Sequence, residues 1–217
     1  MAGLSLAAEL GKPEFDARVL QVLADVPRHL FVPEPIRAHA YLNMPLPIGF
    51  GKTTSQPFIV ALMTDLLQPA PGDRVLEVGT GLGYHAAVLS RLVVQVFSVE
   101  IIADLQREAK QRLKRQGVRN VGFKLGDGRN GWPEHAPFDK ILVAAASDLV
   151  PATLLHQLAS PGRMVVPTGS PEQQSLLLVT KEASGRIVTH EILPVRFAML
   201  SGPEDEDELE DLPRRPS

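Results

Sequence analysis

The sequence predicts an α/β fold with a doubly wound, mostly parallel sheet and an antiparallel strand near the C-terminus. From Gly72 onward, short β-branched segments alternate with helical segments, which is typical of a parallel sheet covered by helices. A glycine-rich turn, Gly79–Gly83, directly follows the first of these segments. The last two strand-like segments are joined too tightly for a crossover helix, so they should pair antiparallel.

The N-terminal part of the chain has a different texture. Residues 14–25 place apolar side chains at helical spacing and predict an amphipathic helix. Prolines between residues 27 and 47 exclude long regular elements there. An apolar segment at helical spacing then begins at Pro57, and proline suits the first position of a helix.

The expected elements of the sheet follow in order. We expect strands over residues 73–78, 94–100, 121–128, 138–146 and 162–169, with helices over 86–93, 103–117 and 151–162. Two further strands, 175–182 and 186–200, flank a turn at Ala183–Arg186. The expected organisation is a Pro-rich cap (1–57), a main domain (58–202) and an acidic tail (203–217). The tail is too acidic and too poor in apolar residues to pack, so we expect it to be disordered.

The composition is that of an ordinary globular protein. The chain has 217 residues, of which 44% are hydrophobic and 22% charged. A formal net charge of −3 creates no overall field that would attract nucleic acid or an anionic membrane. The absence of cysteine excludes disulfides and thiolate chemistry, and the histidines show no metal-ligand spacing. Without a membrane-length apolar run or a basic leader, the expected location is the cytoplasm.

The strongest local motif is VLEVGTGLGYHAAVL, which reads as a strand, a glycine turn and a helix. Its glycines let the backbone approach a ligand closely at a helix N-terminus. A dinucleotide fingerprint needs two residues between its second and third glycines, whereas Gly81 and Gly83 flank only Leu82. With Glu77 two positions before Gly79, the pattern is that of S-adenosylmethionine sites. The alternative is a tight turn with no ligand.

Two further strand tips favour an adenosine-bearing cofactor. Glu100 ends the second expected strand, where a carboxylate can accept both hydroxyls of a ribose. Gly126-Asp127-Gly128 ends the third, where the acid can accept from an adenine amino group while the glycines leave room for the ring. A plain turn remains the alternative for this tripeptide. Open α/β sheets bind ligands at the carboxyl ends of their strands, where all three features fall.

Taken together, these segments resemble the protein-L-isoaspartate O-methyltransferases. The resemblance covers most of the chain and rests on VPRHLFVP, AYLNMPLPIGFGKTTSQP, VLEVGTGLGYHAAVL, VFSVE, NVGFKLGDGRNGWPEHAPFDKILVAAAS, PGRMVVPTG and PVRFAMLSG. The glycine loop alone indicates only a methyltransferase. The T-x-S-Q-P box followed in order by GDG, GW, APFD and PVRF is specific to this family.

The resemblance implies a Rossmann-like, S-adenosylmethionine-dependent methyltransferase that acts on damaged proteins. It would methylate the free carboxylate of L-isoaspartyl residues, with D-aspartyl residues as a second acceptor, and so start repair through a succinimide. S-adenosylhomocysteine would be the product. The resemblance implies Ser55 as the catalytic and substrate-binding residue, Val195, Arg196 and Phe197 beside the substrate peptide, and as cofactor-binding residues Thr53, Thr54, Glu77, Gly79, Thr80, Gly81, Gly83, Glu100, Asp127 and Gly128.

The reaction makes modest demands on these residues. An aspartyl-type carboxylate has a pKa of about 4 and is ionised at neutral pH, so no strong general base is needed. The enzyme must supply alignment and a dry site. We therefore expect Ser55 to hold the non-attacking oxygen or orient the carboxylate, and not to act as a nucleophile. The alternative for Ser55 is a helix cap next to Pro57.

This sequence departs from the common bacterial box G-Q-T-I-S-Q-P at two positions. Lys52 replaces the glutamine and Thr54 the isoleucine. We expect Lys52 to point to solvent, as lysines usually do. Three other functions stay open: a related methyltransferase with a different carboxylate, small-molecule or RNA acceptor, a cofactor binder without catalysis, and a dehydrogenase. The near-neutral charge of the chain without its acidic tail argues against an RNA acceptor. The intact T-x-S-Q-P box argues against a protein that only binds the cofactor. The glycine spacing argues against a dehydrogenase.

Overall fold

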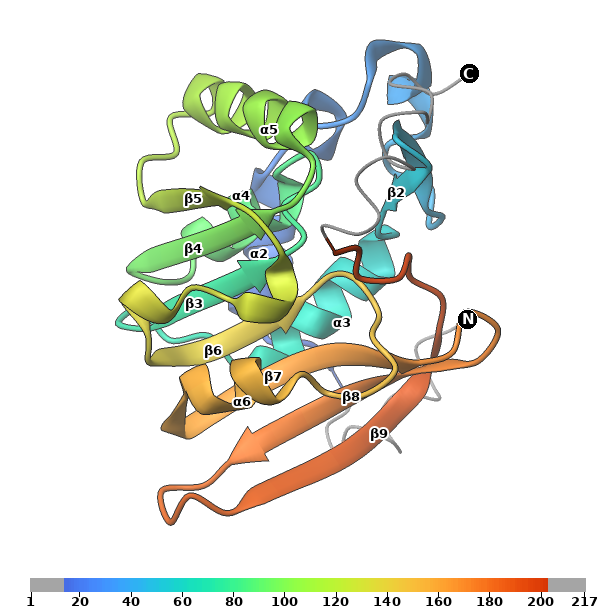
Figure 1. The fold of residues 1–217 in the computed structure, drawn as a ribbon. Coiled ribbons are helices and arrows are strands. Elements are labelled where there is room, and N and C mark those ends of the chain that lie inside the picture. Colours follow the sequence, from blue (N-terminus) through green and yellow to red (C-terminus); the bar gives the residue numbers. More distant parts are fainter. Residues whose placement is uncertain (1–13, 203–217) are drawn as a thin grey trace.

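The structure of the chain is a computed structural model, and it describes residues 14–202 (Figure 1). The acidic tail that we expect to be disordered lies outside the described residues. Within them, one twisted sheet is covered by helices on both faces, and a small hairpin stands apart from it. This agrees with the predicted α/β class.

The sheet has seven strands in the order β5-β4-β3-β6-β7-β8-β9. Its strands are β3 (Arg74–Val78), β4 (Gln95–Glu100), β5 (Val121–Leu125), β6 (Phe138–Val143), β7 (Leu158–Gly169), β8 (Gln174–Lys181) and β9 (Ile187–Val195). Strands β3 to β7 pair in parallel, whereas β8 pairs antiparallel with both β7 and β9. The prediction of a parallel sheet with an antiparallel C-terminal end is confirmed.

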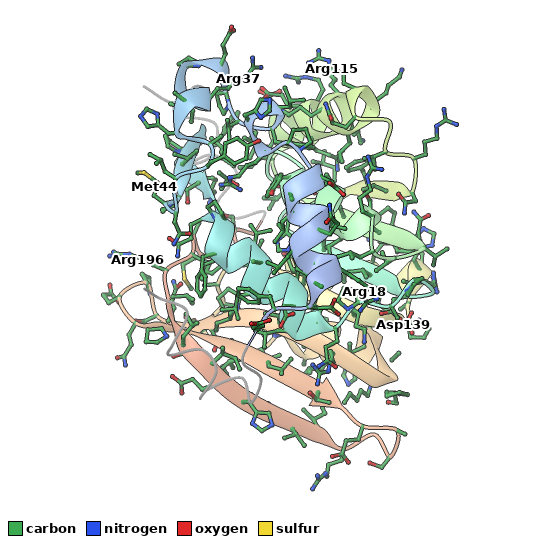
Figure 2. All side chains as sticks on the ribbon, turned by 180° about the vertical axis from the view of Figure 1, so that it is seen from behind. Arg18, Arg37, Met44, Arg115, Asp139 and Arg196 are labelled. Atoms are coloured by element: carbon green, nitrogen blue, oxygen red, sulfur yellow. The ribbon has the colours of Figure 1, made fainter. Side chains whose placement is uncertain are left out.

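Helices cover the two faces of the sheet unequally. Figure 1 shows α6 (Ala152–Gln157) on the near face, and Figure 2, from behind, shows α2 (Ala17–Asp25) and α3 (Pro57–Leu67) crossing the far face. Helices α4 (Tyr84–Ser90) and α5 (Ala103–Arg115) contribute side chains to the same core as α2 and α3. The expected cap and main domain thus share one hydrophobic core.

The Pro-rich segment contains more structure than the sequence suggests. Short 3-10 helices, Arg28–Leu30 and Glu34–His39, precede an antiparallel hairpin of β1 (Leu46–Gly49) and β2 (Lys52–Thr54). The hairpin fits among the prolines because its strands are short and its turn, Gly49–Gly51, has positive φ throughout. Two of these turn residues are glycines, which adopt such angles without strain.

Several element boundaries differ from the expected ones, and the two largest differences lie at the ends of a helix and a strand. The expected helix over 151–162 ends at Gln157, and β7 already begins at Leu158. Pro161 explains the early end, because proline breaks a helix and favours an extended residue before it. The expected strand over 186–200 ends at Val195, and the chain continues as an irregular segment bridged to Ala146 beyond β6. In the described part of the chain, the helices are all too short or too polar to cross a membrane.

Candidate active site

A cavity of about 510 Å³ lies at the carboxyl ends of β3, β4 and β6. Its floor is the glycine loop after β3, and its walls come from the β1–β2 hairpin, the start of α3 and the segment after β9. Of the residues implied by the resemblance, eleven line it: Thr53, Thr54, Ser55, Gly79, Thr80, Gly81, Glu100, Gly128, Val195, Arg196 and Phe197. Glu77, Gly83 and Asp127 are absent from the lining.

The glycine loop needs glycine for backbone conformation and for space. Gly79, Gly81 and Gly83 have φ of 92°, 52° and 85°, which side-chain-bearing residues rarely adopt. A Cβ at Gly83 would also lie 3.0 Å from Leu113 Cδ1 and 3.2 Å from Ala109 Cβ. Gly83 therefore sets how closely α4 packs on α5, while Gly79 and Gly81 leave the backbone open to the cavity.

Glu77 lies beneath this loop and not in the cavity. Its side chain is fully buried, and Ser98 Oγ donates to its Oε2 at 2.5 Å. Ser98 Oγ is in turn 2.5 Å from Thr80 Oγ1, so the three side chains tie β3, β4 and the loop together. Burial, only partly offset by the Ser98 hydroxyl, raises the pKa of Glu77 from 4.5 to about 8. Glu77 thus supports the loop from below.

The raised pKa of Glu77 predicts a specific pH dependence of stability. Between pH 4.5 and about 8 the folded state keeps a proton that the unfolded chain has lost, so stability falls as pH rises through this window. The glutamine in Glu77→Gln does not titrate. We expect the unfolding free energy of the variant, relative to the wild type, to rise by up to about 1.4 kcal/mol per pH unit between pH 5 and 8. Urea titrations at several pH values measure this, with exposed Glu34→Gln as control. Parallel curves for wild type and Glu77→Gln would contradict the placement.

Glu100 is the carboxylate that faces the cavity. Its Oε2 accepts from Gly81 N at 2.8 Å, and its Oε1 accepts from Ile101 N and Ile102 N, both at 3.0 Å. Burial raises the pKa of Glu100, while these three N–H donors and the nearby Lys52 ammonium oppose the shift. The backbone donors hold the carboxylate in a fixed orientation at the tip of β4.

Asp127 and Gly128 have separate tasks. Asp127 Oδ1 accepts from Arg129 N at 2.8 Å, and its carboxylate pairs with Arg129 Nε at 2.9 Å. The acid thus begins the turn Gly128–Asn130 and is held by Arg129 beside the cavity. A Cβ at Gly128 would lie only 2.3 Å from Val78 Cγ1, so glycine is required here for packing against β3.

Ser55 joins the end of β2 to the start of α3 and is half-buried in the cavity wall. Asn43 fulfils the capping role considered for Ser55, because Asn43 Oδ1 accepts from Phe58 N at 3.1 Å. The side chain of Gln56, the residue at the N-cap position of α3, makes no capping hydrogen bond. Among the described residues, no hydrogen bond occupies the Ser55 hydroxyl. The cap interpretation of Ser55 is therefore wrong, and its hydroxyl is available to a ligand.

Lys52 does not point to solvent as expected. Its side chain lines the cavity, and Nζ donates to Ser201 Oγ at 3.1 Å. The reason lies in the tertiary structure. The segment after β9 places the Ser201 hydroxyl next to Lys52, and the two residues are too far apart in the sequence for this contact to be predicted. Lys52 therefore places a positive charge in the cavity that also holds Glu100.

The segment after β9 is fixed by one buried side chain. Gln174 Oε1 accepts from Phe197 N at 2.7 Å, and Gln174 Nε2 donates to Phe197 O at 3.1 Å. Further along, Ala146 N donates to Ala198 O at 2.8 Å, which fastens the segment beyond β6. Arg196 extends outward from the cavity mouth (Figure 2). The role of Gln174 could not be predicted from the sequence, because its local pattern does not distinguish it from other polar residues.

Comparison with known proteins agrees with this geometry. The family profile described as protein-L-isoaspartate(D-aspartate) O-methyltransferase matches residues 8–205. The chain belongs to this family. A protein-L-isoaspartate O-methyltransferase 1 of Polaromonas sp. (strain JS666 / ATCC BAA-500) is 53% identical over 199 residues, covering 92% of this chain and 84% of the relative. One of the same name from Cupriavidus necator is 54% identical over 197 residues, covering 90% and 76%.

Solved structures of family members share the architecture. A protein-L-isoaspartate O-methyltransferase structure, 32% identical, superposes with a TM-score of 0.78 and covers 87% of this chain and 62% of its own. A Plasmodium falciparum structure, 24% identical, has a TM-score of 0.73 with coverages of 86% and 91%, and shows a likeness in fold. The family's Rossmann-like methyltransferase sheet is thus the sheet seen here.

Proposed function

We propose that the cavity performs the family's reaction by aligning an acceptor carboxylate, held near Ser55, with a cofactor held by the glycine loop and Glu100. As a member of the family, the chain is an S-adenosylmethionine-dependent methyltransferase that acts on L-isoaspartyl residues of damaged proteins. The position of Ser55 supports the placement of the acceptor carboxylate opposite the cofactor. It faces the glycine loop across one cavity, with its hydroxyl unoccupied among the described residues.

The residues present fit S-adenosylmethionine. The cavity is within the size range of about 300–1,000 Å³ found for small-ligand sites. Glu100 presents a pre-oriented carboxylate suited to ribose hydroxyls, and Gly79 and Gly81 leave space for close approach. Asp127 and Gly128 are proposed for the adenine edge, and Thr53, Thr54 and Thr80 for polar contacts along the cavity. When bound, the cofactor supplies an electrophilic methyl group on a positively charged sulfur. The Plasmodium falciparum protein was solved in complex with S-adenosyl-L-homocysteine, which is the product expected here.

The chain's own residues then align the acceptor carboxylate and exclude water from the cavity. The acceptor carboxylate is already ionised at neutral pH, so no residue has to remove a proton. Ser55 donates to the non-attacking oxygen, which leaves the other oxygen free to attack. Val195, Arg196 and Phe197 lie beside the acceptor peptide, and the segment they belong to excludes water from the cavity.

The cap and main domain divide the work in this proposal. Residues 1–57 provide the hairpin with the acceptor-side hydroxyls, and residues 58–202 provide the loop and strand tips that hold the cofactor. The acceptors are damaged proteins, and we propose no nucleic-acid or membrane partner. We further propose that the enzyme is a monomer and that it acts in the cytoplasm.

Methyl transfer to two matched peptides tests the proposal. Labelled S-adenosylmethionine is offered with one peptide containing L-isoaspartate and an otherwise identical one containing aspartate. We expect base-labile methylation of the isoaspartyl peptide only. Binding of S-adenosylhomocysteine without transfer to either peptide would instead favour a different carboxylate or small-molecule acceptor.

The chain also contains a dipeptide prone to the damage its family repairs. Asn-Gly forms succinimide readily, and Asn130-Gly131 lies in an ordered turn where Gly131 N donates to Gly128 O at 3.0 Å. Gln157 fixes this turn, because its Nε2 donates to Asn130 O and its Oε1 accepts from Trp132 N, both at 2.8 Å.

Loosening this turn should expose Asn130 to cyclisation. For Gln157→Ala we expect isoaspartate at residue 130 to accumulate several-fold faster than in the wild type, because the attacking Gly131 nitrogen is then less constrained. Mass spectrometry of aged protein, with S-adenosylmethionine withheld to prevent repair, measures the rate. Thr153→Ala, which loses a bond to Arg129 O in the same turn, tests whether any loosening suffices. Equal rates in wild type and Gln157→Ala would contradict protection by Gln157.

A further inference from the structure

Arg28 is a buried cation with no carboxylate partner among the described residues. It lies in the short helix Arg28–Leu30, and only 1% of it is exposed. Its Nε donates to Ala40 O at 2.8 Å and its Nη2 to Ser55 O at 2.7 Å. Its third nitrogen, Nη1, is buried without a hydrogen-bond partner in the described part of the chain. Buried arginines are rare unless paired, so this one needs an explanation.

Packing alone does not explain Arg28. Removing a guanidinium from water carries a large free-energy penalty. Two neutral carbonyls and the face of the Tyr84 ring offset only part of it, because Nη1 has no hydrogen-bond partner among the described residues. The burial lowers the pKa of Arg28, which reflects the same penalty. An apolar side chain of similar volume often serves stability as well or better. Departures of this kind from the rules of stability are expected where a residue serves function.

The contacts of Arg28 lead directly to the proposed catalytic residue. Ser55 O is the carbonyl of a residue that lines the cavity. Within residues 14–202, no helix or strand hydrogen bond fixes Ser55, which lies between β2 and α3. The guanidinium carbon of Arg28 also lies 4.9 Å from the centre of the Tyr84 ring. Tyr84 lines the cavity and is the first residue of α4 after the glycine loop. Arg28 thus connects the acceptor side to the cofactor side.

We propose that Arg28 is a positioning residue for methyl transfer, which fixes Ser55 against Tyr84 so that the Ser55 hydroxyl meets the acceptor carboxylate. Arg28 does not line the cavity, so it acts through Ser55 and does not touch the substrate. This inference rests on the proposed role of Ser55. The forked guanidinium is needed because two carbonyls, twelve and twenty-seven residues away, are held at once.

The test is a double-mutant cycle between Arg28 and Ser55. Arg28→Lys keeps the charge but has no rigid fork, and Arg28→Met keeps much of the volume without the charge. For the isoaspartyl peptide we expect kcat/KM to fall roughly tenfold to thirtyfold in Arg28→Lys and further in Arg28→Met. In a Ser55→Ala background, Arg28→Lys should lower kcat/KM by less than about a further twofold, because the effects of mutating residues that act as a unit do not add.

Cofactor affinity is a further readout that separates positioning from a purely structural role. The affinity for S-adenosylhomocysteine, measured by calorimetry, should stay within about twofold of the wild type in Arg28→Lys. The only contact of Arg28 with the cofactor side among the described residues is the one with the Tyr84 ring, and a lysine ammonium can also lie over that ring. Assays are run well below each variant's melting temperature, so that loss of folded protein does not count as loss of turnover. If Arg28→Met fails to fold, the cycle with Arg28→Lys still decides.

The outcomes distinguish this inference from the proposed function. A wild type that does not methylate the isoaspartyl peptide would overturn the proposed function. An active wild type whose Arg28→Lys and Ser55→Ala losses multiply would overturn the positioning role and leave the function intact. Equal loss of cofactor affinity and turnover in Arg28→Lys would also overturn it, because it would indicate a general disturbance of the cavity.

Discussion

Replacement of Ser55 by alanine is expected to lower kcat for the isoaspartyl peptide about a hundredfold with little change in melting temperature. A hydroxyl that aligns a reacting group in a dry site contributes about this much. Stability should be preserved because the Ser55 hydroxyl has no hydrogen-bond partner among the described residues, so its removal leaves none of them unpaired. Single-turnover kinetics and thermal unfolding measure the two quantities.

Asn43→Ala is the matched control for Ser55→Ala. Asn43 Oδ1 accepts from Phe58 N at the start of α3, so its loss should cost about 1 kcal/mol of stability while turnover of the remaining folded enzyme changes little. The two variants thus separate a catalytic effect from a capping effect within one short stretch of chain. If Ser55→Ala lowers stability and activity together, while Asn43→Ala leaves stability unchanged, the assignment of the two residues is reversed.

Replacement of Glu100 by glutamine is expected to weaken binding of S-adenosylhomocysteine about a hundredfold, or roughly 2.7 kcal/mol. The carboxylate accepts from three backbone N–H groups, so of its roughly four lone-pair positions one is left for a ribose hydroxyl. An amide places an NH₂ group where only acceptors fit, either against the backbone donors or against the ribose. Truncating one side of a buried charged contact typically costs this much. Isothermal titration calorimetry measures the affinity.

Glu77→Gln is a stringent control for this experiment. Glu77 is also buried and lies on the neighbouring strand, but it does not line the cavity and is linked to the glycine loop through Ser98 and Thr80. Its affinity for S-adenosylhomocysteine should remain within a few-fold of the wild type. Equal losses in Glu77→Gln and Glu100→Gln would mean that loop support, and not direct contact, determines binding.

The strand-tip residues could be predicted because their placement follows from topology. Once β3 and β4 are recognised as neighbouring parallel strands, Gly79 and Glu100 must emerge at the same edge of the sheet. The glycine spacing then restricts which ligand can approach. The antiparallel end of the sheet followed equally directly, because the turn at Ala183–Arg186 is too short for a crossover.

Contacts between distant segments could not be predicted. Lys52 faces inward because Ser201 lies above it, and no local pattern connects these two positions. Ser98 completes the link between Glu77 and Thr80, but in the sequence it is one more small residue in a strand. Arg28 follows a proline in a segment that reads as irregular, so its burial against Tyr84 has no local signal either.

The competing interpretations of Ser55 show where local rules reach their limit. A serine two residues before Pro57 satisfies the sequence rule for a helix cap. The donor at the start of α3 is instead taken by Asn43, which the intervening hairpin folds back to the helix. Capping rules identify which residue types can serve, and the path of the chain decides which one does.

One wall of the cavity joins two parts of the chain that are far apart in the sequence. Lys52 in the hairpin meets Ser201, and the bridge between Ala146 and Met199 fastens the same late segment over the sheet. The pairing of β3 with β4 and β6 involves only residues up to Val143, so it does not require this late segment. The wall that joins Lys52 to Ser201 does require it, so the sheet can form before the cavity is complete.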